Sequence, residues 1–303
     1  MEIPMILARM KTSVLVVMIM AACGFFCQAE AQIKIGVLAK DGPAQAMKQW
    51  GATGEYLTGK LGEPVEIVPL GFDQVFPAIE AGNVHFFLVN SSMFITAKLK
   101  YGSVPVATMI NSRQGKSLNA FGGVIFTSAY NDAISSFADI KGKKFGAVEK
   151  ASFGGWQMAY KEFLDAGIDP FKDFASVEFF DKHENVVFAV QNEQVAAGTV
   201  RTDTLERMAA SGAISMDDFK IIGKKDLKEF PFVCSTALYP EWPLAKVAAT
   251  DDTMVSKVVT ALKELKPEDK AAIAAKVVGW SDPLDYTGIE ELQKTLKIGA
   301  FAE

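Results

Sequence analysis

The segment from Lys150 to Gly155 (KASFGG) contains residue types that can bind an anion. It lies between an expected strand and an expected helix, and the start of a helix carries free N–H groups and the positive end of the helix dipole. Ser152 adds a hydroxyl donor, and the two glycines let a ligand approach the backbone closely. The pattern predicts an anion-binding loop; the competing interpretation is an ordinary helix that Ser152 caps. The segment is not a P-loop, because no Gly-Lys-Ser/Thr sequence follows.

Arg201 lies in a second polar segment, GTVRTD (198–203), at the end of an expected strand. Its planar guanidinium group matches two oxygens of an oxyanion, and Thr199 and Thr202 are smaller donors. The competing interpretation is an internal salt bridge from Arg201 to Asp203 or Glu206. This segment is a second candidate for binding an oxyanion.

Asn90-Ser91-Ser92 follows the expected apolar strand at 84–89, at the end of the strand where α/β sheets place ligands. It mirrors the Ser152 loop, although taken alone it is more simply another helix cap. His183 opens an expected helix and could donate a hydrogen bond to an anion. His85 is expected at the edge of its strand, and Arg113 is expected in a solvated loop.

Sequence patterns typical of catalysis are missing from this chain. No two histidines have metal-ligand spacing, and there is no GxSxG elbow and no Cys-His constellation. Carboxylates are plentiful, but none forms a pair that the sequence can place. The sequence therefore predicts no catalytic residues, no metal site and no cofactor.

Residues 1–31 have the order of a secretory signal peptide. Arg9 and Lys11 precede an apolar run at 14–26, and Ala29-Glu30-Ala31 has the small-residue spacing that a signal peptidase cleaves. The apolar run is shorter than the roughly 20 residues that cross a bilayer. Lipid attachment at Cys23 is the main competing interpretation.

Composition limits the possible partners. The formal net charge is −5, and without a basic patch this argues against nucleic acid. Half of the residues are hydrophobic, enough for two cores of ordinary domain size. Cleavage after Ala31 would remove Cys23 and Cys27 and would leave Cys234 without an internal disulfide partner.

Apolar runs predict two similar α/β modules. Strands at 33–39, 65–70 and 84–89 alternate with helices, which is typical of a parallel sheet with covering helices. Residues 249–303 are expected to be largely helical. The alternation of strands and helices starts again at residue 122, which two modules explain better than a single doubly wound domain. The strands expected in the second module are 122–128, 144–149, 177–180, 195–200, 219–223 and 231–238.

Five segments carry a resemblance to a known family. They are FGGVIF (121–126), SFGG (152–155), HENVVFAV (183–190), AGTVRTDTLERMA (197–209) and FPFVCSTALYPEWP (230–243). With these segments the chain resembles the phosphate/phosphite/phosphonate-type periplasmic binding proteins of ABC transporters, and most closely the branch also found as the sensor domain of tetrathionate-sensing histidine kinases. The resemblance covers about 33–245, and AGTVRTDTLE together with LYPEWP is its most specific part.

The resemblance implies an α/β fold of the two-lobed type II periplasmic binding protein class. Each lobe would be a mixed sheet flanked by helices, and two hinge crossovers would lie near Phe121 to Val124 and Phe232 to Thr236. The implied divisions are a signal peptide at 1–31, lobe one at 32–122 and 236–303, and lobe two at 123–235.

The resemblance also implies a ligand between the lobes. Phosphonate binders tend to have tyrosines where this chain has Phe72 and Phe94. Losing two hydroxyl donors while keeping Arg201 moves the expected ligand from an aminophosphonate toward a more oxidised or doubly charged anion, such as a sulfur oxyanion. The implied ligand-binding residues are Ser152, Phe153, Gly154, His183, Thr199, Arg201 and Asp203 in lobe two, with Asn90, Ser91, Ser92, Phe72 and Phe94 in lobe one.

The expected function is a periplasmic solute-binding protein, monomeric and without enzymatic activity, that captures a small oxyanion. Its partner would be an ABC transporter permease or a membrane sensor kinase. One alternative is a co-receptor without a ligand, in which the cleft is collapsed and Arg201 is tied to Asp203. Another is an enzyme on the same fold, such as a thiamine-pyrimidine synthase, which the lack of a cysteine-rich motif disfavours.

Overall fold

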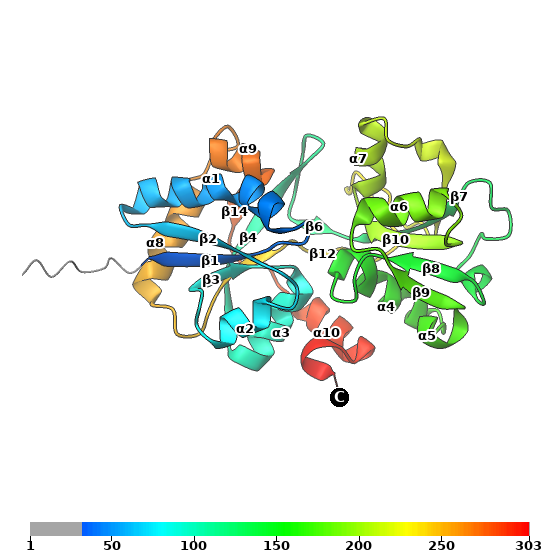
Figure 1. Cartoon of the computed structure of the whole chain (residues 1–303), viewed down its shortest axis with the longest axis horizontal. Coiled ribbons are helices and arrows are strands. Elements are labelled where there is room, and N and C mark those ends of the chain that lie inside the picture. Colours follow the sequence, from blue (N-terminus) through cyan, green and yellow to red (C-terminus); the bar gives the residue numbers. More distant parts are fainter. Residues whose placement is uncertain (1–31, 303) are drawn as a thin grey trace, which may run out of the picture. The chain divides into compact units, whose positions relative to one another are not determined.

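The computed structural model describes residues 32–302, which fold around two β-sheets with covering helices (Figure 1). The predicted signal peptide at 1–31 and the alternative lipid site at Cys23 lie outside the described residues. Within the described residues, none of the helices combines the length and apolar content needed to cross a membrane.

The first sheet is mixed, in the order β14-β4-β13-β3-β1-β2, with β5 paired to β4. β1 pairs parallel with β2 and β3, whereas β13 runs antiparallel to both β3 and β4. We call this sheet and its helices lobe one. Its strands are β1 (Ile33–Leu38), β2 (Val65–Leu70), β3 (Phe86–Leu88), β4 (Val104–Arg113), β5 (Lys116–Leu118), β13 (Pro243–Lys246) and β14 (Val277–Ser281).

Lobe one is buried on both faces of its sheet, because successive strand side chains point to opposite sides. In β3, Phe86 and Leu88 join one core with Trp50 of α1, and Phe87 joins the other with Ile95 of α3. The covering helices are α1 (Pro43–Leu61), α2 (Val75–Glu80), α3 (Ser91–Tyr101), α8 (Asp252–Lys263), α9 (Lys270–Ala275) and α10 (Thr287–Leu296).

The second sheet, with its helices, forms lobe two and has the order β11-β7-β10-β8-β9. The central strand β10 is antiparallel to β7 and parallel to β8. The strands are β7 (Gly123–Ser128), β8 (Lys144–Ala147), β9 (Ser176–Phe179), β10 (Ala197–Arg201) and β11 (Phe219–Ile222). The helices are a π-helical turn (Phe153–Gln157) continuing into α4 (Met158–Asp165), then α5 (Pro170–Asp173), α6 (His183–Gln191) and α7 (Thr204–Ala210).

The chain passes between the sheets twice, through β6 (Ala120–Phe121) and β12 (Tyr239–Pro240). These two short strands pair antiparallel with each other in a sheet of their own (Figure 1). The second crossing strand therefore begins three residues after the position expected at Phe232 to Thr236.

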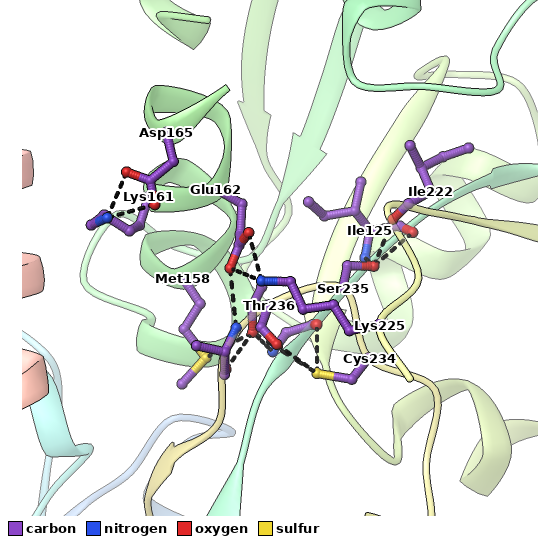
Figure 2. A network of polar contacts seen from close by, with 12 residues as sticks. Ile125, Met158, Lys161, Glu162, Asp165, Ile222, Lys225, Cys234, Ser235 and Thr236 are labelled. Atoms are coloured by element: carbon purple, nitrogen blue, oxygen red, sulfur yellow. Dashed lines mark hydrogen bonds and ion pairs between the residues drawn. The ribbon is translucent and has the colours of Figure 1, made fainter. Parts of the chain in front are cut away.

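One strand prediction was wrong. The expected strand at 231–238 forms no regular ladder, because Ser235 and Thr236 bind β7 through their side chains. Ile125 N donates to Ser235 Oγ at 2.9 Å, and Gly123 N donates to Thr236 Oγ1 at 2.9 Å (Figure 2). Residues 249–302 are largely helical as expected, with α8, α9 and α10, and β14 adds an edge strand to the first sheet.

A salt bridge fixes this crossing segment to α4. Lys225 Nζ lies 2.9 Å from both carboxylate oxygens of Glu162, and the Ala237 backbone N donates to Glu162 at 3.0 Å (Figure 2). Glu162 therefore joins the helix to the segment that connects the lobes.

Ser235→Ala is expected to lower the free energy of unfolding by about 1–3 kcal/mol. The hydroxyl is fully buried; it accepts from Ile125 N and donates to Ile222 O at 2.7 Å, so its loss leaves two buried backbone groups without partners. Urea denaturation measures the change. The control is Ser256→Ala, whose hydroxyl bonds an exposed helix carbonyl; equal effects of the two variants would contradict the prediction.

Candidate functional site

The Ser152 loop leads into a π-helical turn. Gln157 N donates to Ser152 O at 3.2 Å and Met158 N donates to Phe153 O, each five residues back. Such a turn leaves its first backbone N–H groups without acceptors inside the helix, and π-helical turns are frequent at functional sites. Ser152 occupies the N-cap position, but its side chain makes no capping hydrogen bond within the described chain. Its hydroxyl is therefore not used as in the ordinary-cap interpretation.

Glycine at 154 allows this turn to approach the end of β10. A Cβ at Gly154 would lie 2.9 Å from the Phe121 ring and 3.2 Å from Arg201 Cβ. The ring of Phe153 meets Phe121 edge-on at 5.9 Å and Tyr239 at 5.1 Å. The turn therefore meets Arg201 beside the crossing strands β6 and β12.

Arg201 is held by a buried carboxylate that the sequence analysis gave no role. Its terminal nitrogens bond the two oxygens of Glu241, one of them at 3.3 Å, and its guanidinium carbon lies 4.0 Å from the centre of the Phe121 ring. The Arg201 side chain is 12% exposed and that of Glu241 is 0% exposed. Arg201 Nε finds no hydrogen-bond partner among residues 32–302. Although burial opposes the charge, Glu241 raises the pKa of Arg201 above its ordinary value.

A second arginine reaches the site from lobe one. Arg113 ends β4, and its Nη1 lies 3.8 Å from Asp203 Oδ2; the other Asp203 oxygen is 3.7 Å from Arg201 Nε. The expectation of a solvated loop for Arg113 was wrong, because Arg113 lies in β4, pairs with Lys116 of β5, and has a side chain that is only 22% exposed. Asp203 adopts a left-handed conformation (φ 73°) at the start of α7. Two arginines and two carboxylates thus form one charge-balanced cluster.

His183 begins α6 and binds the backbone of β10. Its Nδ1 accepts a hydrogen bond from Arg201 N at 3.2 Å, which requires an unprotonated Nδ1 and leaves the N–H on Nε2. Burial, with the nearby charge of Lys40 and the arginines, lowers its pKa well below 6.5. His183 is therefore a neutral donor.

The two threonines of the segment have different roles. Thr199 shares a face of β10 with Arg201; it is 0% exposed, and its hydroxyl has no partner in the described chain. Thr202 is already occupied, since its hydroxyl accepts from Gly122 N at 3.2 Å. Thr199 is thus the unused donor.

In lobe one, Asn90 reaches the Ser152 loop. Its side chain caps α3 by accepting from Met93 N at 2.9 Å and donates to the carbonyl of Ala151 at 3.0 Å. This bond joins the two loops that the sequence predicted as anion sites.

The other lobe-one candidates have structural partners. Ser91 donates to Pro240 O at 2.8 Å, and Ser92 accepts from Gln293 at 2.8 Å. Phe94 packs edge-on against Tyr286 in the core, and Phe72 is partly buried against the same core. The structure therefore brings Asn90 together with the lobe-two candidates, whereas Ser92 and Phe94 lie in the packed interior.

In residues 32–302, no three histidine, cysteine, aspartate or glutamate side chains are grouped so that they could hold a metal ion.

Comparison with known proteins identifies relatives over most of the chain. The family model described as "ABC transporter, phosphonate, periplasmic substrate-binding protein" matches residues 35–293. The tetrathionate sensor histidine kinase TtrS of Salmonella typhimurium is 29% identical over 283 residues, which cover 92% of this chain and 46% of that protein. The chain thus spans about half the length of this curated relative.

Solved structures share the architecture at low identity. A binding-protein component of an ABC phosphonate transporter from Pseudomonas aeruginosa superposes with TM-score 0.69 at 16% identity, covering 87% of this chain and 85% of its own. PhnD1 from Prochlorococcus marinus in complex with methylphosphonate superposes with TM-score 0.69 at 14% identity, covering 88% of this chain and 98% of its own. XAC2383 from Xanthomonas citri bound to chloride superposes with TM-score 0.68 at 16% identity, covering 87% of this chain and 99% of its own. These likenesses establish the expected two-lobed type II periplasmic-binding-protein fold.

We expect His183 to remain neutral through the weakly acidic range. Because its folded pKa lies below the unfolded value, the unfolded chain takes up the proton first, and stability falls as pH drops below 6.5. Titration by NMR measures the pKa directly, and the chain has only two histidines. His183→Gln assigns the signal, with His85→Gln as the matched variant; a midpoint near 6.5 for His183 would contradict the structure.

Proposed function

This chain belongs to the family of periplasmic substrate-binding proteins of ABC phosphonate transporters, and from that premise we propose that it closes around a small oxyanion. Solute binding is the role of the family; the oxyanion and its site are our proposal. The contacts would come from the Ser152 loop, His183, Thr199 and Arg201 in lobe two, with Asn90 in lobe one.

The observation that carries this proposal is a group of buried donors without acceptors. Thr199 Oγ1, Arg201 Nε and Arg113 Nε have no hydrogen-bond partner within residues 32–302, although Asp203 Oδ1 faces Arg201 Nε at 3.7 Å. An unpaired buried donor costs about 1–3 kcal/mol, so three in one region call for an acceptor. An oxyanion accepts from several donors at once, and the free N–H groups of the π-helical turn add to them.

Contacts between the lobes explain how binding would favour closure. Asn90 bonds Ala151, and Arg113 faces Asp203, so each lobe already contacts the other near Arg201. An anion that accepts from both lobes would stabilise this closed arrangement relative to an open one. A membrane protein can then recognise the closed form.

We further propose that residues 1–31 direct export to the periplasm and that the protein acts there without catalysis. Its partner is an ABC transporter permease or a membrane sensor kinase. The likeness to about half of a tetrathionate sensor kinase favours a sensor kinase as the partner and a sulfur oxyanion as the ligand.

A specific observation also favours a second function, a co-receptor without a ligand. Both terminal nitrogens of Arg201 bond Glu241, so the arginine forms an internal ion pair. Its main partner is Glu241 and not Asp203, which the sequence suggested. In that case the cluster serves only to hold the lobes together.

Anion binding separates the two functions. We expect the melting temperature of the purified protein to rise with at least one of phosphate, phosphite, methylphosphonate, sulfate, thiosulfate and tetrathionate, because a ligand of the folded state stabilises it. Calorimetric titration would confirm the affinity. Absence of binding by every anion would favour the co-receptor.

Thr199→Val is expected to weaken anion binding about 10- to 100-fold without lowering stability. The substitution keeps the shape and removes a hydroxyl that has no partner in the described chain. Thr127→Val is the matched control: Thr127 is equally buried in the neighbouring strand, but it donates to Ala196 O at 2.6 Å. It should lower stability and leave affinity unchanged. The reverse pattern would remove Thr199 from the site.

A further inference from the structure

The carboxylate opposite Arg201 is fixed in place. Glu241 N donates to Asn119 O at 2.8 Å, and Glu241 O accepts from the Tyr286 hydroxyl at 2.8 Å. With its side chain fully buried, Glu241 cannot leave Arg201 without exposing two opposite charges to an apolar interior. Arg201 therefore meets any ligand as a neutralised donor.

Three other cations that act electrostatically on His183 are also paired with carboxylates, whereas Lys150 of the Ser152 loop lies 5.9 Å from the centre of the Phe179 ring. Arg113 faces Asp203, Arg207 bonds Glu184 at 2.8 Å, and Lys40 bonds Asp41. Among these neighbours His183 is neutral. The cluster of Arg113, Arg201, Asp203 and Glu241 thus contributes no net charge.

Helix starts add positive potential at the site. The π-helical turn that continues into α4, and α3 behind Asn90, each contribute about half an elementary charge. Together they balance roughly one negative charge. Phe121, Phe153 and Tyr239 pack ring against ring beside Arg201, so a second negative charge would remain uncompensated in a medium of low dielectric constant.

We infer that the site selects a tetrahedral head group with a single negative charge, a sulfonate-type R–SO₃⁻ or a singly ionised R–PO₃H⁻, and that Glu241 sets this preference. The inference rests on the proposed function and narrows its ligand class. It also differs from the doubly charged anion that the sequence suggested.

The first test uses the unmodified protein and two methyl compounds. Affinities are measured by calorimetry at pH values below and above the second pKa of methylphosphonate. Methanesulfonate, which keeps a single charge at all of these pH values, is the internal control. Methylphosphonate affinity should fall about tenfold per pH unit above that ionisation, and methanesulfonate affinity should not change.

The outcomes are distinct. Tighter binding of methylphosphonate on the alkaline side would overturn the inference and leave oxyanion binding intact. Failure of both compounds and of all the other anions tested would instead overturn the proposed function.

The second test changes the charge of Glu241. Glu241→Gln keeps the size and an accepting oxygen, so sulfate affinity should rise by at least about tenfold relative to methanesulfonate. Glu264→Gln removes a surface charge that pairs with Lys60 and should change neither affinity. Equal weakening of both ligands would show that Glu241 only maintains the structure. If Glu241→Gln does not fold, the pH series on the unmodified protein still shows whether the site prefers the singly charged form of the ligand.

Discussion

The buried pair of Arg201 and Glu241 is the interaction on which the candidate site depends. It joins the end of β10 to the segment between β12 and β13, and Tyr286 fixes that segment from the C-terminal part of the chain. Removing one member of such a pair typically costs about 3–5 kcal/mol, because the other charge remains buried. The pair therefore holds Arg201 in one position. That position leaves Nε available beside Thr199, at the start of the π-helical turn.

One helical segment contacts both the candidate site and a crossing segment. Its first turn carries Gly154 against Arg201, and α4, which continues it, carries Glu162, bonded to Lys225 and to the backbone at Ala237. Because a helix moves along its axis as a rigid body, a shift of the first turn would also displace the crossing segment that is bonded to Glu162. The side-chain bonds of Ser235 and Thr236 to β7 keep that segment attached to lobe two. Closure would then involve the residues after Thr236, where β12 pairs with β6.

Local patterns in the sequence were enough to predict much of the fold, because buried strands read as apolar runs and helix starts as polar segments after them. The strand of Phe86 and Phe87 and the polar turn at Asn90 show this directly. Pairings between distant segments could not be predicted. Nothing near Arg113 indicates that Asp203 faces it, and Glu241 lies in a motif whose tryptophan and prolines are the more conspicuous residues. The sequence also could not distinguish Thr199, which has an unused hydroxyl, from Thr202, which binds Gly122.

Occupation of Arg201 by Glu241 changes the kind of anion that fits without closing the site. A free guanidinium contributes a full charge and five N–H donors, whereas here one N–H of each terminal nitrogen is bonded to Glu241. Recognition would then come from the remaining N–H groups of Arg201, its Nε included, together with several neutral donors around one head group. Such an arrangement responds to the shape and protonation of the ligand more than to its total charge, since each oxygen needs its own donor. A carboxylate buried next to an arginine is therefore compatible with an anion receptor, provided that the anion brings little charge to the aromatic side chains around Arg201.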